Sequence, residues 1–204
     1  HSLQVANLAE AAIYQIGGNP LLVRAGAMYH DIGKVDMPMY FIENQNSVSN
    51  PHDGLAFEES ARIIKSHVIR GIEKAKKHSI PEPIIDFIRT HHGTSLLQYF
   101  YHSFLKNFPE KVPDEDVFRY PGPLPFSRES AVLMMADSVE AASRSLQNPD
   151  AKAINNLVDS IIDNQMDQKQ YDNAPVTLRD LSEIRKIFKK MLISIYHARI
   201  EYPH

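Results

Sequence analysis

The sequence has 204 residues, of which 43% are hydrophobic and 23% are charged, and its 22 Lys and Arg against 25 Asp and Glu give a formal net charge of -3. This composition supports one sizeable core or two small ones and excludes wholesale disorder, while the near-neutral balance argues against a binder of polymeric nucleic acid. Cysteine is absent, so disulfides, thiolate metal sites and Cys nucleophiles are excluded. Any metal ion must therefore be bound by His, Asp or Glu.

The predicted elements are helices almost throughout. Hydrophobic residues recur at steps of three and four up to Ile16, where Gly17-Gly18 ends a first helix. Asn19 then caps a second helix, which runs to His30-Asp31. Residues 34–56 are polar and irregular, which predicts a long loop of the kind that often carries function.

Further helices are predicted over 57–75, 81–92, 96–108, 127–146, 150–161 and from 177 to about 202, with a Pro-rich connection at 109–126. We expect Ser127 and Asp150 to cap two of them, and Thr177 with Asp180 to form a capping-box-like pair. We interpret the second His-Asp pair, His52-Asp53, as a structural cap for the helix that begins at Phe57.

The absence of repeats and of long alternating runs predicts a single all-α domain over residues 1–204. The last helix is amphipathic and fits either closure of the core or a dimer contact. No apolar run reaches the roughly 18 residues of a membrane span. The chain starts at His1 inside a helical pattern, without an initiator Met, so we expect a fragment of a longer protein.

The ten histidines matter through their placement rather than their number. Ionisable side chains on apolar helix faces, or at the ends of apolar helices, are predicted at seven positions: His1, His30, Asp31, His67, His91, His92 and Asp137. Burying each alone would cost about 2–5 kcal/mol or shift its pKa. A shared metal site removes that penalty, and seven ligands suit two six-coordinate ions better than one tetrahedral zinc. Histidine-rich ligation favours Fe, Mn or another transition metal.

Each position also has an ordinary structural explanation. His1 or His67 alone would more often be a hydrogen-bonded core residue, and His91-His92 at a helix end interacts favourably with the helix dipole. Asp137 alone would more often pair with a buried Arg or Lys. The metal hypothesis depends on all seven occurring together.

The order of these residues resembles the HD-domain metal-dependent phosphohydrolases with a seven-ligand dinuclear site, with His30-Asp31 inside His-Asp-Ile-Gly-Lys34. Further segments are similar to one family among them, the cytoplasmic HD domains of bacterial membrane proteins with seven transmembrane helices, which are cyclic-di-AMP phosphodiesterases of the PgpH type. Those segments are Asn50-Pro-His-Asp53, Ile64-Lys-Ser-His-Val68, His91-His-Gly-Thr-Ser95, Tyr99-Phe-Tyr101, Tyr120-Pro-Gly-Pro123 and Ala136 to Leu146. The Gly-Tyr-Pro signature of the related cyclic-di-GMP enzymes is absent.

The resemblance implies a helical HD domain that hydrolyses cyclic di-AMP to linear pApA at two Mn or Fe ions held by the seven residues. Asp31 would bridge the ions and take part in catalysis, and Lys34, one turn later, would reach the phosphate or the leaving oxygen. Thr94 and Arg128 are candidate substrate contacts, and adenine would stack on Tyr99-Phe-Tyr101 or Tyr120. The domain would lie at the cytoplasmic face of the bacterial inner membrane, tethered by helices upstream of His1.

Three alternatives remain open at this point. An HD-domain nucleotidase acting on mononucleotides or alarmones would use the same ligands. A di-iron oxygenase is a second alternative within the fold. The third is a sensor that binds a nucleotide without turning it over, although its complete ligand set would be unusual for a degenerate site.

Overall fold

The computed structural model describes residues 1–45, 50–147 and 149–197. Within these ranges its regular secondary structure is helical apart from an isolated antiparallel bridge between Leu96 and Arg119. The helices in chain order are α1 (Ser2–Ile16), α2 (Pro20–Tyr29), α3 (Phe57–Lys77), α4 (Glu82–Thr90), α5 (Gln98–Asn107), α6 (Glu115–Phe118), α7 (Arg128–Ser143), α8 (Ala151–Asp167) and α9 (Leu178–His197). Three short 3-10 helices lie between α2 and α3: η1 (Ile32–Asp36), η2 (Pro38–Tyr40) and η3 (Ile42–Asn44). The predicted all-α fold is confirmed.

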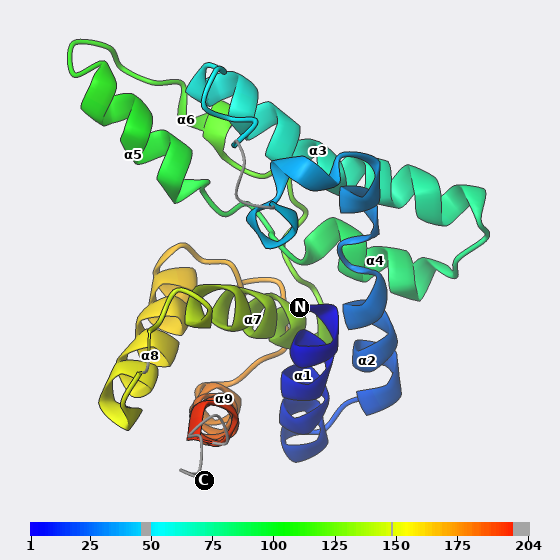
Figure 1. The fold of residues 1–204 in the computed structure, drawn as a ribbon. Coiled ribbons are helices and arrows are strands. Elements are labelled where there is room, and N and C mark those ends of the chain that lie inside the picture. The colour runs from blue at the N-terminus through cyan, green and yellow to red at the C-terminus, as the bar shows by residue number, and fades with distance from the viewer. Residues whose placement is uncertain (46–49, 148, 198–204) are drawn as a thin grey trace, which may run out of the picture.

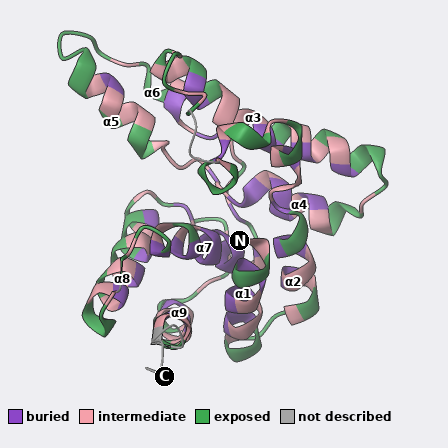
Figure 2. Ribbon diagram, viewed as in Figure 1, coloured by how far each residue is buried: buried purple, intermediate pink, exposed green. Residues whose placement is uncertain are grey.

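The helices form two groups that meet near the start of α1 (Figure 1). One group comprises α1, α2, α7, α8 and α9 and encloses the main core, in which Leu8, Val139 and Phe188 are completely buried. Helix α7 contacts α1, α2, α4, α8 and α9, and Figure 2 shows it buried along most of its length. The other group, α3 with α5 and α6, has a smaller core around Phe104 and Phe118. Helix α4 packs against α2, α3 and α7 and so connects the two groups.

The caps predicted at Asn19, Ser127 and Asp150 agree with the structure. The side chain of Asn19 accepts a hydrogen bond from Leu22 N at the start of α2, and Asp150 does the same for Ala153 N at the start of α8. Ser127 forms a capping box with Ser130 at the start of α7. These local signals fix where the helices begin, because they satisfy backbone N–H groups that have no partner inside the helix.

The Thr177–Asp180 pair is reciprocal, with Thr177 N donating to Asp180 and Asp180 N donating to the Thr177 hydroxyl. Helix α9, which it opens, buries Leu181, Ile184 and Phe188 in the main core. The described part of this helix therefore closes the core. The predicted end of the helix, beyond residue 197, lies outside the described residues.

Two segments predicted as irregular contain short helices. The long loop at 34–56 includes η1, η2 and η3, and the Pro-rich connection includes α6. The expected capping role of His52-Asp53 is wrong, because Ala56 is the N-cap of α3 and no side chain caps that helix. Instead, His52 Nε2 lies 2.9 Å from the carbonyl oxygen of Tyr40, so the ring ties two parts of the loop together.

None of the helices within the described residues combines the length and the hydropathy that crossing a membrane requires.

Candidate metal centre

Five helices deliver ionisable side chains to the junction between the two helix groups. His1 precedes α1, His30-Asp31 follow α2, His67 lies in the middle of α3, His91-His92 follow α4, and Asp137 lies on α7. The structure thus brings all seven predicted metal ligands together. They divide into two overlapping clusters, in each of which the ligand atoms lie within 4.8 Å of one another.

We call these clusters the His-rich half and the acidic half. The His-rich half is formed by Asp31, His67, His91 and His92. The acidic half is formed by His1, His30, Asp31 and Asp137. Asp31 is the one residue that belongs to both clusters, as a bridging ligand would.

The two carboxylate oxygens of Asp31 face different halves. Its Oδ1 lies 3.5 Å from Nε2 of both His67 and His91. Its Oδ2 lies 3.3 Å from Nε2 of His30 and 3.5 Å from Nε2 of His1. A single carboxylate is therefore oriented to offer one oxygen to an ion in each half.

Gly33 explains how Asp31 comes so close to α3. A Cβ at this position would lie 1.9 Å from the carbonyl oxygen of His67 and 2.6 Å from the backbone nitrogen of Gly71. Any larger residue would collide with the α3 backbone, which cannot move as a flexible side chain can. The glycine of the His-Asp-Ile-Gly-Lys segment thus lets η1 pack directly on α3 beside His67.

Three of the imidazoles are oriented by their own helices. Nδ1 of His30, His67 and His91 lies 2.6 to 2.9 Å from the carbonyl oxygen of the residue three positions earlier. A carbonyl oxygen only accepts hydrogen bonds, so each Nδ1 must donate. This leaves Nε2 as the nitrogen that faces the cluster, and it fixes the tautomer that a metal ligand needs.

In the acidic half, the carboxylates hold protons on the imidazoles. Burial by itself would lower the pKa of His1, but its hydrogen bonds to Asp137 and Glu140 raise that pKa to about 9. Burial likewise opposes the protonation of His30, whereas the nearby carboxylates of Asp31 and Asp137 raise its pKa to about 10. Asp137 has a pKa well below its usual range, because contacts with His1 and His30 outweigh its burial.

In the His-rich half, the pKa values of His67 and His92 are lowered, so these two imidazoles are neutral. Burial lowers the pKa of His67 to about 3, with only partial compensation from Asp31. Burial and the adjacent imidazoles of His91 and His67 lower the pKa of His92 well below its usual value. Neutral imidazoles are the protonation state that binds metal ions.

The donor set fits two divalent metal ions, one in each half. Nε2 of His30 and Oδ1 of Asp31 are buried and have no hydrogen-bond partner among the described residues. Buried polar atoms without partners cost free energy, so their convergence with four further imidazoles and a second carboxylate calls for a cation. Imidazole with carboxylate is a ligand combination suited to divalent transition metals.

Lys34 lies beside this centre. Its Nζ is 2.7 Å from Oδ2 of Asp31 and 2.7 Å from Oε1 of Glu43. It also borders a cavity of about 420 Å³ whose walls include His1, His92 and Asp137. The ammonium group thus stands at the entrance to the centre, where it adds positive charge.

Thr94 follows the His91-His92 pair, but its backbone N–H and its hydroxyl oxygen already have hydrogen-bond partners. Its backbone N–H donates to Oε1 of Gln170, and its hydroxyl oxygen accepts from Nε2 of Gln170. Its backbone N–H is therefore not free to contact a phosphate, whereas the hydroxyl hydrogen can still donate, so the predicted substrate contact at Thr94 would use the hydroxyl. Gln170 is completely buried and lies between α8 and α9, a placement that no local sequence pattern indicated.

Arg128 is not brought to the centre. It begins α7, and its guanidinium donates to the carbonyl oxygens of Ile16 and Pro175. Asp137 lies nine residues further along α7, so at a rise of about 1.5 Å per residue the two are well apart. The predicted substrate contact at Arg128 is corrected to a structural role at the end of α1.

Two residues outside the seven predicted ligands border them: Tyr120, a candidate for stacking on adenine, and Glu140, which the sequence had not singled out. Tyr120 stacks on His92, with ring centroids 4.1 Å apart, and is only 7% exposed. Glu140 contacts His1 from α7. Glu140 follows Asp137 by three residues, so both lie on one face of α7. This spacing is the sequence signal that could have identified Glu140.

Comparison with known proteins agrees with this geometry. The family model for the HD domain matches residues 1–142. The chain belongs to the HD-domain family. This HD domain is 45% identical over 203 residues to the cyclic-di-AMP phosphodiesterase PgpH of Bacillus subtilis, an alignment that covers 100% of the chain and 28% of that relative. The chain thus spans little more than a quarter of the relative's length.

Two crystal structures of the HD domain of the L. monocytogenes phosphodiesterase PgpH also match. One has a TM-score of 0.90 and 45% identity, covering 97% of this chain and 92% of that one. The other, in complex with cyclic di-AMP, has a TM-score of 0.92 and 44% identity, covering 96% and 91%. The resemblance inferred from the order of the ligands is confirmed.

Proposed function

We propose that this HD domain is a metal-dependent phosphodiesterase that hydrolyses cyclic di-AMP to linear pApA. The observation that carries the proposal is the complete two-part centre, in which one carboxylate, Asp31, offers an oxygen to each half. The complex of the L. monocytogenes HD domain with cyclic di-AMP supports the choice of substrate. Hydrolysis adds the oxygen of water to one phosphorus and releases the ribose 3′ oxygen, which takes up a proton.

The proposed cofactors are two Mn or Fe ions. One ion would be held by His67, His91 and His92, and the other by His1, His30 and Asp137. Asp31 would contact both ions. Bound divalent ions supply hydroxide near neutral pH, by lowering the pKa of a bound water, and neutralise phosphate oxygens. The five imidazoles favour Mn or Fe over Mg or Ca, which prefer oxygen ligands.

The remaining polar groups are proposed to bind the phosphate and the leaving oxygen. Lys34 reaches Asp31 and Glu43 with the same ammonium group, so a phosphate at the centre would meet a cation already held in place. The Thr94 hydroxyl can donate to a phosphate oxygen while it accepts from Gln170. Lys34 would position a positive charge and Thr94 a hydrogen-bond donor, and neither would form a covalent bond with the substrate.

The adenine bases have an aromatic cavity next to the centre. Tyr40, Phe41, Tyr99 and Phe100 line a cavity of about 400 Å³. Ile42 and Glu43 border both this cavity and the one at the metal centre, so the two spaces are neighbours. We propose that one base stacks here, with Tyr99 available because it is 74% exposed, whereas Tyr120 is covered by its packing on His92.

The cellular setting is also a proposal. We propose that residues 1–204 form one domain of a longer bacterial protein, anchored in the inner membrane with this domain at the cytoplasmic face. The greater length of the B. subtilis relative supports this arrangement. A homodimer through the outer face of α9 is a further proposal.

Product analysis by chromatography tests the function. The purified domain, loaded with Mn(II) or Fe(II), is incubated with cyclic di-AMP and, separately, cyclic di-GMP. We expect conversion of cyclic di-AMP to pApA and a loss of at least about 10³-fold for Asp31→Asn, because that change removes charge from both halves and forfeits several kcal/mol of transition-state stabilisation. Asp53→Asn is the matched control: Asp53 is exposed, belongs to the other His-Asp pair and should retain full activity.

Other outcomes would favour the alternatives. Faster turnover of deoxynucleoside triphosphates or ppGpp than of cyclic di-AMP would indicate a nucleotidase. Consumption of dioxygen by the iron-loaded domain would indicate an oxygenase. Tight binding of cyclic di-AMP without any product, with either metal, would overturn the proposal in favour of a sensor.

A further inference from the structure

One imidazole of the centre is oriented differently from the three that use their own helices. Nδ1 of His1 lies 2.5 Å from Oε2 of Glu140, on α7. A carboxylate accepts the hydrogen bond, so Nδ1 of His1 donates and its Nε2 is directed to Oδ1 of Asp137, 2.8 Å away. Glu140 therefore sets the tautomer and the ring plane of a proposed metal ligand from a neighbouring helix.

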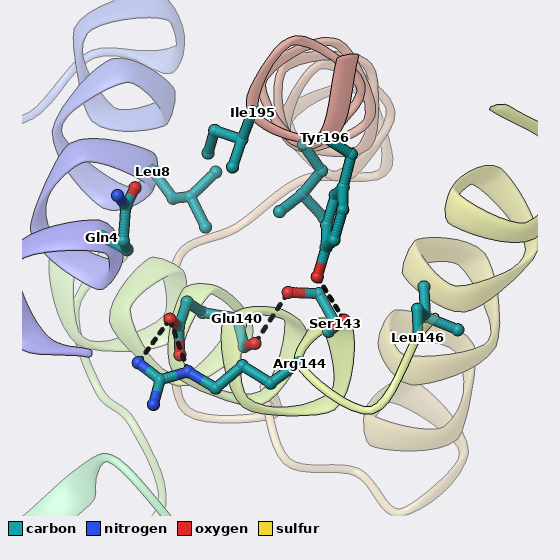
Figure 3. A pocket seen from close by; sticks show the side chains of 9 residues that line it. Gln4, Leu8, Glu140, Ser143, Arg144, Leu146, Ile195 and Tyr196 are labelled. Carbon is teal, nitrogen blue, oxygen red and sulfur yellow. Dashed lines mark hydrogen bonds and ion pairs between the residues drawn. The ribbon is translucent and has the colours of Figure 1, made fainter. Parts of the chain in front are cut away.

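Glu140 is itself held in place by a second contact. Its other oxygen, Oε1, accepts hydrogen bonds from Nε and Nη2 of Arg144, at 2.9 and 2.8 Å. Figure 3 shows this pair on one wall of a cavity of about 320 Å³, with Gln4 and Leu8 of α1 across from it. The Glu140 side chain is only 7% exposed, whereas that of Arg144 is 43% exposed. A buried carboxylate with both oxygens engaged has little freedom to turn away from His1.

We propose that Glu140, held by Arg144, is a positioning residue for the acidic half and acts through His1. The proposal rests on the proposed metal-dependent function. A carboxylate behind an imidazole raises the basicity of the ligand and adds negative charge, whereas the carbonyls behind His30, His67 and His91 only orient the rings. Glu140 should therefore affect the ion in the acidic half and leave the ion in the His-rich half unchanged.

The test is Mn(II) binding, measured by calorimetric titration and by the electron paramagnetic resonance of free Mn(II). Wild-type protein is expected to bind two ions. In Glu140→Gln, the affinity of one ion should fall about 10- to 100-fold, while the other stays within twofold. Glu129→Gln is the matched control, because Glu129 lies on the same helix but its carboxylate accepts from Asn19 N at the opposite end. Both ions should bind to this control as to wild type.

Two further backgrounds show whether Glu140 acts through His1. In His67→Ala, which keeps the acidic half, adding Glu140→Gln should weaken the remaining ion by the same 10- to 100-fold. In His1→Ala, adding Glu140→Gln should change nothing further, because residues that act as a unit are not additive. Arg144→Ala, which leaves the carboxylate in place, should produce a smaller loss confined to the same ion.

The outcomes separate this inference from the function on which it rests. If wild type binds two ions and Glu140→Gln weakens both equally or neither, the positioning role is wrong while the metal centre stands. A loss that persists in the His1→Ala background would also overturn it, since Glu140 would then act by another route. If wild-type protein binds no ions, the metal centre itself fails and the inference fails with it.

Discussion

The acidic half and the His-rich half share Asp31, but they balance charge in opposite ways. In the acidic half, Asp31 and Asp137 face imidazoles whose pKa values are raised to about 9 and about 10, so protons provide the positive charge. In the His-rich half, burial lowers the pKa of His67 to about 3, so this imidazole carries no such proton. Asp31 raises the pKa in the acidic half together with Asp137 and, at His1, with Glu140, two carboxylates that the His-rich half lacks.

The contrast has a consequence for metal binding. An ion entering the acidic half must displace protons that the carboxylates stabilise, whereas an ion entering the His-rich half meets His67 and His92 already neutral. The acidic half also contains the imidazole whose Nδ1 donates to a carboxylate, that of His1, whereas His30, His67 and His91 each donate to a backbone carbonyl oxygen. An ion in the acidic half and an ion in the His-rich half should therefore respond differently to mutation and to pH.

Two variants, each lacking one ligand from one half, should distinguish the two ions most strongly. His67→Ala should abolish the ion in the His-rich half, and Asp137→Ala the ion in the acidic half, so each variant should bind one Mn(II) instead of two. The rate of hydrolysis should fall by more than the roughly 10- to 100-fold typical of replacing a residue that hydrogen-bonds to a metal ligand, because both proposed ions would act on one phosphate. Metal stoichiometry and initial rates on cyclic di-AMP measure the two effects.

The controls for this pair are His78→Ala and Asp53→Ala. Both residues are exposed and lie outside the clusters, so stoichiometry and rate should stay at wild-type values. If either ligand variant retained two ions, or if one variant lost both, the division into two halves would be wrong.

Gly33→Ala should disturb the shared carboxylate without removing a ligand. Its Cβ would lie 1.9 Å from the carbonyl oxygen of His67, so η1 must move away from α3 and carry Asp31 with it. Overpacking of this kind costs about 1–3 kcal/mol, which should appear as a lower Tm and a weaker ion in the His-rich half. Gly54→Ala is the control, since a Cβ there meets nothing within 4 Å. An unchanged Tm in Gly33→Ala would contradict the close packing.

Sequence periodicity predicted the helices and their caps well, because both depend on nearby residues. Asn19, Ser127 and Asp150 each bind a backbone N–H within three residues, which a linear pattern reveals. The metal ligands were predicted by a different route, since their order along the chain resembles a known family and a metal site explains why so many ionisable groups lie on apolar faces.

What the sequence could not predict depends on contacts between distant segments. Gln170 engages Thr94 across 76 residues, and Glu140 reaches His1 across 139. Arg128 was misjudged for the same reason: its position before the Asp137 helix suggested closeness to the substrate, yet the helix axis carries it to the far end of α1. His52 lies outside the two clusters, and its partner is a loop carbonyl and not a helix N-terminus.

The dependence of metal affinity on pH should distinguish the halves most finely. At pH 7 the pH is below the raised pKa values of His1 and His30, so both imidazoles are protonated and an ion must release their protons. The metal affinity of the acidic half should therefore rise with pH up to about 9. Linkage gives about a tenfold gain per pH unit for each proton displaced. His67 has a lowered pKa of about 3 and releases none. Titrating Mn(II) at pH 7 and 8.5 should therefore give a steep gain in His67→Ala, which keeps the acidic half, and a nearly flat response in Asp137→Ala. Equal slopes would show that both halves bind ions from the same protonation state.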